Sequence, residues 1–283
     1  MDQAIGVVLL NFNGFEDTVN CIKSIENQVG IKIEICVVDN ASINESVEKI
    51  SKYITENKFK HKITLIENKK NEGFARGNNV GIKYLRSQGI EFIFVLNNDT
   101  LMTENDSLKK LIDSYRPGVG VINPACVGFN GEFQEPYRLS QGNMIKDYCQ
   151  ALALTGWQVF KAIFNVDYSI HKHTNKAFVP DEYKYIIQGN AYILTPDYFR
   201  EYKQLFPKTF LYFEELYLLW YLQKANLTTV YCENIVIKHK EAGSDKKISH
   251  YYKLKKAKCM VASVVRGFVL LPKNKDQINR CYK

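Results

Sequence analysis

The segment Phe92-Ile93-Phe94-Val95-Leu96-Asn97-Asn98-Asp99 is an apolar run that ends in two amides and a carboxylate. A continuous apolar run is typical of a parallel strand that is buried on both faces. Three similar runs precede it, at residues 5–10, 33–38 and 63–66, and helical patterns separate all four. Strands that alternate with helices predict parallel crossover units. We therefore expect an α/β fold, a three-layer sandwich with a mostly parallel, Rossmann-like central sheet.

Beyond residue 118 the pattern is less regular. Residues 140–180 are aromatic and basic without a clear period, so they predict no element. A capping box at Ser42 and Glu45 is expected to open the second helix. The other expected elements are strands at 119–123, 186–194, 229–231 and 235–238, a hairpin at 128–133, and helices at 196–205, 216–222 and 248–268.

Composition excludes several classes of protein. With 46% hydrophobic and 24% charged residues in 283, the chain is neither disordered nor collagen-like, and it shows no internal repeat. Its seven cysteines are scattered without a Cys-x-x-Cys pair, which argues against a disulfide scaffold or a zinc cluster. Neither a signal peptide nor an apolar run of the ~18 residues that a membrane span needs is present. We therefore expect a cytoplasmic protein.

Positive charge is concentrated at the C-terminus. Residues 240–283 contain twelve Lys or Arg against three acids, so that the remaining chain is close to neutral although the total is +8. Residues 246–271 combine these charges with tyrosines and apolar residues. One interpretation is that this basic amphipathic helical segment binds an anionic membrane surface, namely the inner face of the plasma membrane. The other is that it is a C-terminal helix packed on the core, with its lysines in solvent. No module that binds nucleic acid accompanies the charge, so we expect no nucleic-acid partner.

Polar side chains follow all four predicted N-terminal strands. In an open α/β sheet, ligands bind beyond the carboxyl ends of the strands. Asp39 is suited to accept a hydrogen bond from a base or a ribose hydroxyl, and Asp99 to hold a divalent cation between two phosphates. Each could instead cap a turn or a helix. The segments concerned are Asn11-Phe12-Asn13-Gly14, Asp39-Asn40-Ala41-Ser42, Asn71-Glu72-Gly73-Phe74-Ala75-Arg76-Gly77-Asn78-Asn79 and Asn97-Asn98-Asp99.

A second polar cluster lies near residue 214. Glu214 and Glu215 open an apolar helix, and a helix N-terminus stabilises acids. Flanking aromatic residues would desolvate a carboxylate and raise its pKa, as a general base requires. His239, at the end of a predicted strand, is either a metal ligand or a surface histidine.

Taken together, these motifs closely resemble family 2 glycosyltransferases, which have the GT-A fold. The resemblance spans about residues 4–245 and includes Gly243-Ser244. Its nearest branch contains bacterial rhamnosyl-, galactofuranosyl- and related transferases of surface-polysaccharide synthesis. The resemblance implies inverting transfer of a sugar from a UDP- or dTDP-sugar to a hydroxyl of a glycan or lipid-linked acceptor. It also implies a nucleotide-sugar-binding half at 1–105, an acceptor and catalytic half at 106–245, and a basic helical tail at 246–283.

The resemblance also assigns roles to individual residues. Glu215 falls where the family carries its catalytic Asp, with Glu214 as the base if the register is shifted by one. Asp99 and His239 match the site of Mn²⁺ or Mg²⁺, although Asn97 replaces the first acid of the Asp-x-Asp motif. The residues expected to bind the donor are Asn11, Asn13, Asp39, Asn71, Gly73, Arg76, Asn79, Asn97 and Asn98.

Two alternative functions are a nucleotidyltransferase and an inactive homologue of a glycosyltransferase. A nucleotidyltransferase would carry a Gly-rich loop with a Lys after the first strand, and residues 11–15 offer neither. An inactive homologue that binds nucleotide or glycan as a partner subunit would explain the two departures, Asn97 and Glu215. Four aromatic residues are suited either to an acceptor groove or to the core: Tyr137, Trp157, Tyr185 and Tyr212.

Overall fold

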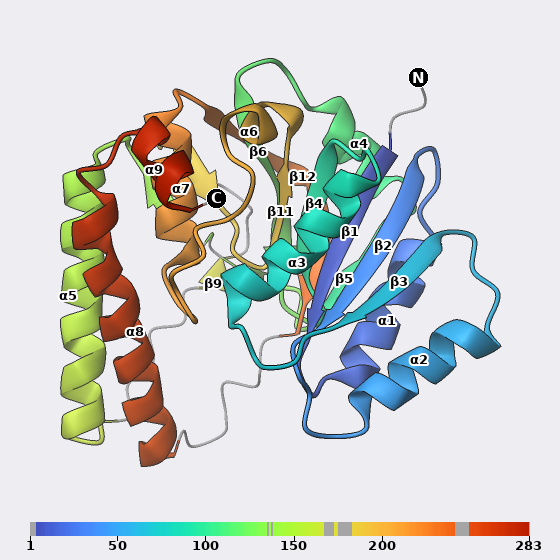
Figure 1. The fold of residues 1–283 in the computed structure, drawn as a ribbon, viewed down its shortest axis with the longest axis horizontal. Helices are drawn as coiled ribbons and strands as arrows, with labels where there is room; N and C mark the ends of the chain where they lie inside the picture. Colours follow the sequence, from blue (N-terminus) through green and yellow to red (C-terminus); the bar gives the residue numbers. More distant parts are fainter. Residues whose placement is uncertain are drawn as a thin grey trace.

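The computed structural model describes residues 4–134, 136, 138–166, 173–174, 183–240 and 249–282. At its centre is a curled mixed sheet in the order β3-β2-β1-β4-β11-β6-β12-β5, to which β7 and β9 are attached (Figure 1). Three residues named above, Tyr137, Gly243 and Ser244, lie outside the described residues.

The four expected N-terminal strands are parallel neighbours. They are β1 (Ala4–Asn11), β2 (Lys32–Asp39), β3 (Lys62–Glu67) and β4 (Phe92–Asn97), and they are connected by α1 (Phe15–Glu26), α2 (Ser46–Glu56) and α3 (Phe74–Ser87). Asn11 lies opposite Asp39, and Leu10 lies opposite Asn97. Because the strands are parallel and in register, the polar residues that follow them share one edge of the sheet.

The second half of the chain completes the sheet with mixed strand directions. β11 (Ala191–Leu194) runs antiparallel between β4 and β6 (Val119–Val127), while β12 (Thr228–His239) runs parallel to β6. β5 (Thr100–Met102) follows β4 closely but pairs with the end of β12. The smaller elements are α4 (Ser107–Asp113), β7 (Phe133–Gln134), β8 (Arg138–Ser140), β9 (His173–Thr174), β10 (Tyr185–Ile187), α6 (Pro196–Glu201) and α7 (Glu214–Lys224).

A hydrophobic layer covers each face of the sheet. On one face, Ile22 of α1 and Leu111 of α4 belong to the same buried cluster as Val7 of β1. On the other face, Leu85 of α3 and Leu219 of α7 share a second cluster with the β1, β2 and β4 side chains of that face. Each fully buried side chain of this size contributes about 1.5–3 kcal/mol through removal from water. The three-layer α/β/α sandwich expected from the sequence is confirmed.

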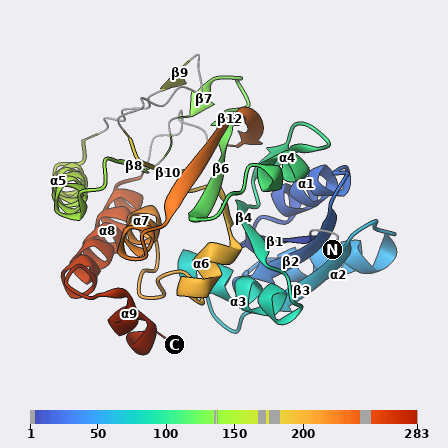
Figure 2. The same ribbon diagram turned by 90° about the horizontal axis from the view of Figure 1, so that it is seen from above.

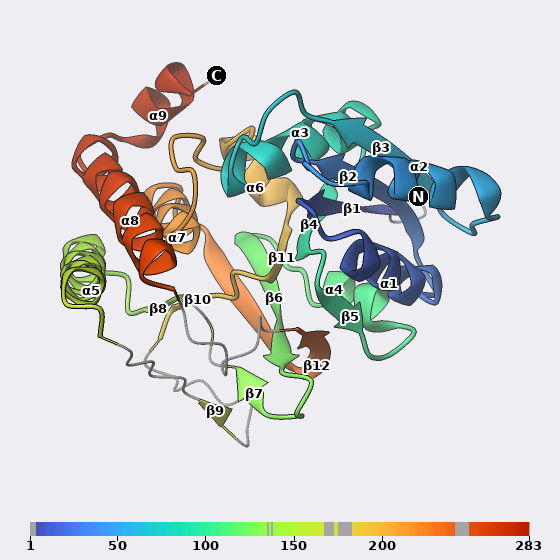
Figure 3. The same ribbon diagram turned by 90° about the horizontal axis from the view of Figure 1, so that it is seen from below.

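Three helices lie at the side of the molecule where the chain ends. α5 (Met144–Ile163) and α8 (His250–Leu270) are long and lie side by side, and α9 (Lys275–Cys281) follows α8. Figures 2 and 3 show the α5–α8 pair at the end of the molecule opposite α2. Within the part of the chain that the structure describes, no helix is both long and apolar enough to cross a membrane.

Several predicted elements need correction. The single strand expected at 186–194 is two strands, β10 and β11, because a turn at Gly189 and Asn190 separates them. The strands expected at 229–231 and 235–238 form one strand, β12, with a register shift between Cys232 and Val236. The strand expected at 119–123 continues to Val127, and the helix expected at 196–205 ends at residue 201.

The expected capping box is also absent. α2 begins at Ser46, and its N-cap, Glu45, makes no side-chain capping bond. Ser42 instead donates from its backbone N–H and its hydroxyl to the Asp39 carboxylate, at 2.8 and 2.7 Å. Ser42 therefore satisfies the buried Asp39 carboxylate at the end of β2, and it does not cap α2.

Candidate active site

Asn11 and Asp39 form the centre of the site at the ends of β1 and β2. Both side chains are buried, and Asn11 donates from Nδ2 to Asp39 Oδ2 at 2.6 Å. Asn11 Oδ1 accepts from the Thr18 hydroxyl at 2.9 Å. Both Asp39 oxygens therefore already accept hydrogen bonds, Oδ2 from Asn11 and the Ser42 hydroxyl, and Oδ1 from the Ser42 N–H. A donor group of a ligand would add to this network at Oδ1, which accepts one bond.

The loop after β1 is fixed by the loop after β2. Asn13 has a positive φ of 60°, a conformation that Asn tolerates better than most residues. Its N–H donates to the Ser42 hydroxyl at 2.8 Å, and its Oδ1 accepts from the Ile43 N–H at 2.8 Å. The Asn13 side chain therefore joins two loops, which gives it a structural role at the edge of the site.

Asn71 and Gly73 hold the loop before α3. Asn71 Oδ1 accepts from the Gly73 N–H at 2.9 Å and from Asn40 Nδ2 at 3.0 Å. Gly73 has φ 78°, and a Cβ there would lie 2.2 Å from the carbonyl oxygen of Phe210. Only glycine fits this contact, because the obstructing atom is backbone. The segment before α7 is thereby tied to the start of α3, where the Phe74 N–H donates to the same carbonyl at 2.8 Å.

Asn79 and Arg76 lie farther along α3. Asn79 exchanges two hydrogen bonds with the backbone of Leu205, at 2.9 and 2.8 Å, so its amide already has partners in the core. Arg76 is half-exposed and pairs with Glu72 at 2.7 Å. Asn79 is therefore directed to the segment after α6 and Arg76 to the residue before Gly73, while Asn11, Asn13, Asp39, Asn97 and Asn98 gather at the strand ends.

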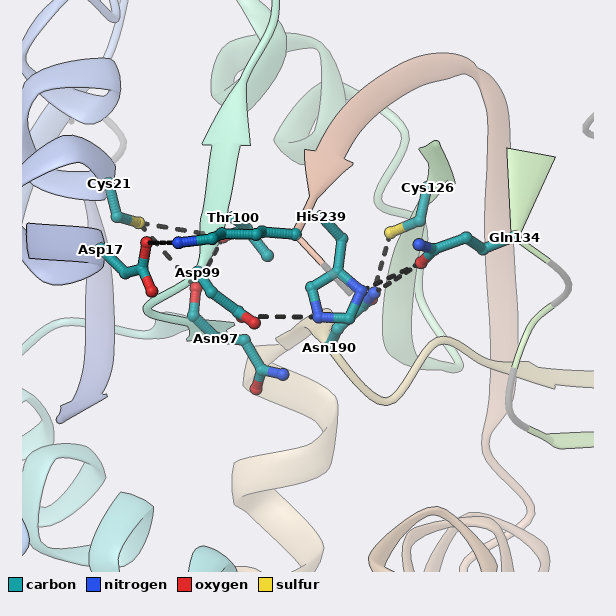
Figure 4. Close-up of polar contacts among 10 residues, drawn as sticks. Asp17, Cys21, Asn97, Asp99, Thr100, Cys126, Gln134, Asn190 and His239 are labelled. Carbon is teal, nitrogen blue, oxygen red and sulfur yellow. Dashed lines mark hydrogen bonds and ion pairs between the residues drawn. The ribbon is translucent and has the colours of Figure 1, made fainter. Parts of the chain in front are cut away.

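The three residues after β4 point in different directions. Asn98 turns toward α1, where its Nδ2 donates to the Thr18 hydroxyl at 2.9 Å. The Asn97 N–H donates to the Asn190 carbonyl at 2.9 Å, which ties β4 to the turn before β11. Figure 4 shows the Asp99 carboxylate directed at the His239 ring and the Asn97 amide lying beside it.

Asp99 and His239 form the start of a chain of polar contacts. Asp99 Oδ1 lies 3.4 Å from His239 Nε2, and His239 Nδ1 lies 3.0 Å from Gln134 Oε1. An amide oxygen can only accept, so Nδ1 carries a proton and donates to Gln134, while Nε2 is directed at Asp99. Asn190 donates to the same Gln134 oxygen at 3.4 Å. The imidazole, nearly fully buried, is thus fixed in orientation as metal-ligating histidines are.

Glu214 and Glu215 begin α7 and are partly buried. Burial, followed by the charge of Glu215, raises the pKa of Glu214 to about 8. Burial also raises the pKa of Glu215, but the nearby Arg138 guanidinium opposes the increase. Tyr212 and Phe213 both have positive φ, 74° and 69°, so the chain enters the helix through a strained turn. At neutral pH Glu214 therefore keeps its proton, while the Arg138 guanidinium favours the carboxylate form of Glu215.

The sequence reasoning missed three residues of this region. Arg138 lies close enough to Glu215 that the two charges interact, and its Nε is buried without a hydrogen-bond partner. Gln134 and Asn190 support His239. The break Gln188-Gly189-Asn190 in an apolar run was a usable signal for the turn. No sequence pattern indicated Arg138, because it comes close to Glu215 only through the packing of β8 near α7.

Of the four aromatic candidates, three are described. Trp157 lies on the exposed side of α5 and stacks on Phe160 with ring centres 5.5 Å apart. Tyr185 lies on β10, and Tyr212 is partly buried with Lys256 above its ring. These positions place Tyr212, which lies two residues before Glu214, nearest in sequence to the carboxylates.

The strand order and the polar strand ends define a protein of the GT-A fold class. The model of the family described as "Glycosyl transferase family 2" matches residues 6–169. The chain belongs to this family and is a glycosyltransferase.

Comparisons with individual proteins agree with this assignment. The chain is 21% identical, over 238 residues, to the low-salt glycan biosynthesis hexosyltransferase Agl10 of Haloferax volcanii, covering 84% of this chain and 67% of that protein. The structure resembles the mannosyltransferase PcManGT from Pyrobaculum calidifontis in complex with GDP-Man and Mn²⁺, with a TM-score of 0.61, 12% identity, and coverage of 98% and 67%. It also resembles S. aureus TarS in complex with UDP-GlcNAc, with a TM-score of 0.54, 12% identity, and coverage of 92% and 66%. At these identities the structural likeness shows the fold.

Proposed function

We propose that this glycosyltransferase is a cytoplasmic, inverting hexosyl- or deoxyhexosyltransferase. It would move a sugar from a UDP- or dTDP-sugar to a hydroxyl of a glycan or lipid-linked acceptor, in bacterial surface-polysaccharide synthesis of the rhamnosyl or galactofuranosyl type. The observation that carries the proposal is the pair Asp99–His239 at the end of β4, which shares a sheet edge with the Asn11–Asp39 pair. A relative described as a hexosyltransferase supports the reaction class.

The donor would lie along the ends of β1, β2 and β4. In this proposal Asp39, Asn11 and Asn13 contact the base or ribose, and the loop with Asn71 and Gly73 borders the diphosphate. Asn97 has no hydrogen bond from its side chain to another described residue in the structure, and its amide lies beside Asp99 (Figure 4). Asn98, Arg76 and Asn79 act by positioning the loops, since their side chains are bonded to neighbouring backbone or side chains.

The residues at the end of β4 fit a divalent cation. Asp99 offers a carboxylate oxygen, and His239 offers an imidazole nitrogen whose other nitrogen is bonded to Gln134. Oxygen and imidazole donors suit Mn²⁺, and a cation held by few protein groups completes its coordination with substrate phosphates and water. Asp99 and His239 would therefore hold Mn²⁺ or Mg²⁺. When bound, the cation would neutralise charge on the nucleoside diphosphate.

Glu215 is proposed as the general base. Its carboxylate form, which the Arg138 guanidinium favours, can accept the proton of the acceptor hydroxyl. The acceptor oxygen forms a bond to the anomeric carbon as the bond to the diphosphate oxygen breaks, and the nucleoside diphosphate leaves with that electron pair. One displacement from the opposite face inverts the anomeric configuration. Arg138 would act as a positioning residue that favours the carboxylate form of Glu215.

Calorimetric titration with UDP and with dTDP, each with and without Mn²⁺, tests the proposal. We expect Mn²⁺-dependent binding of one nucleotide by the wild-type protein and at least a tenfold loss of that dependence in Asp99→Ala. Lys58→Glu, on an exposed turn far in sequence from the site, is the control. If neither nucleotide binds to the folded protein, the active-transferase proposal fails. Nucleotide binding without turnover of any donor sugar would favour the inactive homologue instead.

A further inference from the structure

The paired helices α5 and α8 expose an unusually apolar outer face. They are antiparallel: Tyr148 near the start of α5 donates to the Val264 carbonyl at 3.0 Å, and His250 at the start of α8 contacts the Ala162 carbonyl at 2.8 Å. Their outer face is defined by the exposed apolar residues Ile145, Leu152, Trp157, Phe160, Ile163, Phe164, Leu254, Val261, Val265, Phe268 and Val269. Solvent-exposed apolar patches of this extent mark interaction sites.

The exposed apolar residues of α5 and those of α8 meet where the two helices contact each other. A groove is lined by Val159 and Ile163 from α5 and by Leu254 and Val261 from α8. Ile163, Phe164 and Phe268 are each more than 60% exposed, although their side chains are among the most hydrophobic. The apolar surface is therefore continuous across both helices and does not belong to one helix alone.

The charges on this outer face are positive. α8 contains five Lys or Arg and no acid between residues 250 and 270. The single acid of α5, Asp147, is buried and accepts a hydrogen bond from the Ser140 hydroxyl at 2.6 Å. Four basic side chains are exposed among the apolar residues: Lys146, Lys255, Lys258 and Arg266. A face that is both apolar and cationic complements the surface of an anionic bilayer.

We propose that the outer face of the α5–α8 pair docks on an anionic lipid bilayer. The apolar side chains enter the interface between headgroups and acyl chains, while the lysines extend their charged ends to lipid phosphates. A second copy of the chain is a poorer occupant. In a two-fold symmetric contact, the same lysines would face one another, and these helices have no exposed acid to offset them.

The inner side of α8 connects this surface to the candidate base. The Ser263 hydroxyl donates to the Leu211 carbonyl at 2.9 Å, and the Tyr217 hydroxyl donates to the Ser263 carbonyl. Lys256 Nζ lies 5.6 Å from the centre of the Tyr212 ring. The segment that leads into Glu214 thus packs against the helix that would lie on the bilayer. Resting on the proposed function, this arrangement favours a lipid-linked acceptor over a free glycan.

Vesicle flotation of the full chain tests the proposal. The probes are vesicles of phosphatidylglycerol with phosphatidylethanolamine, and vesicles of phosphatidylcholine alone. We expect at least tenfold stronger partitioning to the anionic vesicles, which weakens as salt is raised. The apolar variant Ile163→Ser/Phe164→Ser/Phe268→Ser and the charge variant Lys255→Glu/Lys258→Glu should each lose at least tenfold in partitioning.

Two controls separate docking from misfolding. Val29→Ser removes an exposed apolar side chain, and Lys58→Glu reverses an exposed charge, both outside the outer face; each should bind vesicles as the wild type does. Titration with UDP and dTDP on the outer-face variants should match the wild type, which keeps failure of the docking proposal distinct from failure of the transferase proposal. Equal binding to both vesicle types, no binding, or wild-type binding by both variants would overturn the proposal. So would a dimer in sedimentation that the apolar variant dissociates.

Discussion

Glu215 and Arg138 are two partly buried groups whose opposite charges act on each other's pKa. Burial raises the pKa of the carboxyl, and the guanidinium opposes this by favouring the ionised form. Burial in turn lowers the pKa of Arg138, which the charge of Glu215 counteracts. The two groups therefore stabilise each other's charged forms in a poorly solvated place, where a charge without a partner is costly.

Replacement of Glu215 tests the assignment of the base. Glu215→Gln keeps the size of the side chain but cannot accept a proton, so we expect turnover to fall about 10²–10⁴-fold. Nucleotide binding, measured by calorimetry, should stay at the wild-type level because the side chain is not part of the donor network. The wild-type rate should rise with pH through an inflection above the ordinary carboxyl value of about 4.3. Normal turnover in Glu215→Gln together with its loss in Glu214→Gln would make Glu214 the base.

Glu214 makes stability depend on pH. In the unfolded chain the pKa of this carboxyl is near its ordinary value of 4.5, whereas in the folded protein burial raises the pKa to about 8. Between these values the folded state binds more protons, so stability falls as the pH rises. Glu214→Gln removes this effect and should be more stable than the wild type by about 2–4 kcal/mol at pH 8, and little changed near pH 4.5.

Urea unfolding at several pH values measures this difference. Glu91→Gln, which neutralises an exposed carboxylate before β4, is the matched control and should follow the wild-type curve. A constant difference between Glu214→Gln and the wild type over the whole range would contradict the raised pKa.

At the scale of elements, the start of α3 and the loop before α7 act as one unit. Gly73 allows the Phe210 carbonyl to approach the first turn of α3, and the Phe74 N–H donates to it. α7 begins four residues after Phe210, so this contact helps to set where the two glutamates lie. The start of one helix therefore positions the start of another across 140 residues of sequence.

Gly73→Ala tests that coupling. Gly73 and Gly89 have nearly equal positive φ, 78° and 81°, but a Cβ at Gly89 would have no atom within 4 Å. Alanine at Gly89 should cost about 1–2 kcal/mol through backbone conformation alone. Alanine at Gly73 should cost more even before the Phe210 contact is counted, because φ 78° with ψ −173° is a conformation open essentially to glycine only. Gly73→Ala should cost more in urea unfolding and should also reduce turnover at least tenfold, because the loop before α7 must move. Equal effects of the two substitutions on stability and turnover would show that the Phe210 contact does not position the site.

α5 shows why periodicity fails for one long element. A helix is recognised in sequence by polar residues on the side that faces water. The outer side of α5 is apolar, with Leu152, Trp157, Phe160 and Ile163 all exposed, so the expected alternation is missing. The exposed apolar side that makes α5 hard to recognise in the sequence is also the feature on which the proposed bilayer docking rests.

At the scale of the whole molecule, the sheet unites residues that are distant in sequence. β5 leaves the end of β4 and pairs with β12, so Thr100 lies opposite His239 and Asp99 faces the imidazole. The α5–α8 pair lies at the opposite end of the molecule from α2 (Figure 1). A bilayer on that side would leave the ends of β1, β2 and β4 free to receive a donor from solution.

The sequence by itself determined the α/β class, the four parallel N-terminal strands and the polar residues that follow them. These features depend on local hydrophobic patterns and on the rule that parallel strands end at one edge. Tertiary structure alone decided that Gln134 orients His239, that Arg138 neighbours Glu215, and that Asn98 and Asn79 face the protein interior. Such contacts join residues far apart in the chain, and their geometry depends on how strands and helices pack, which no local pattern records.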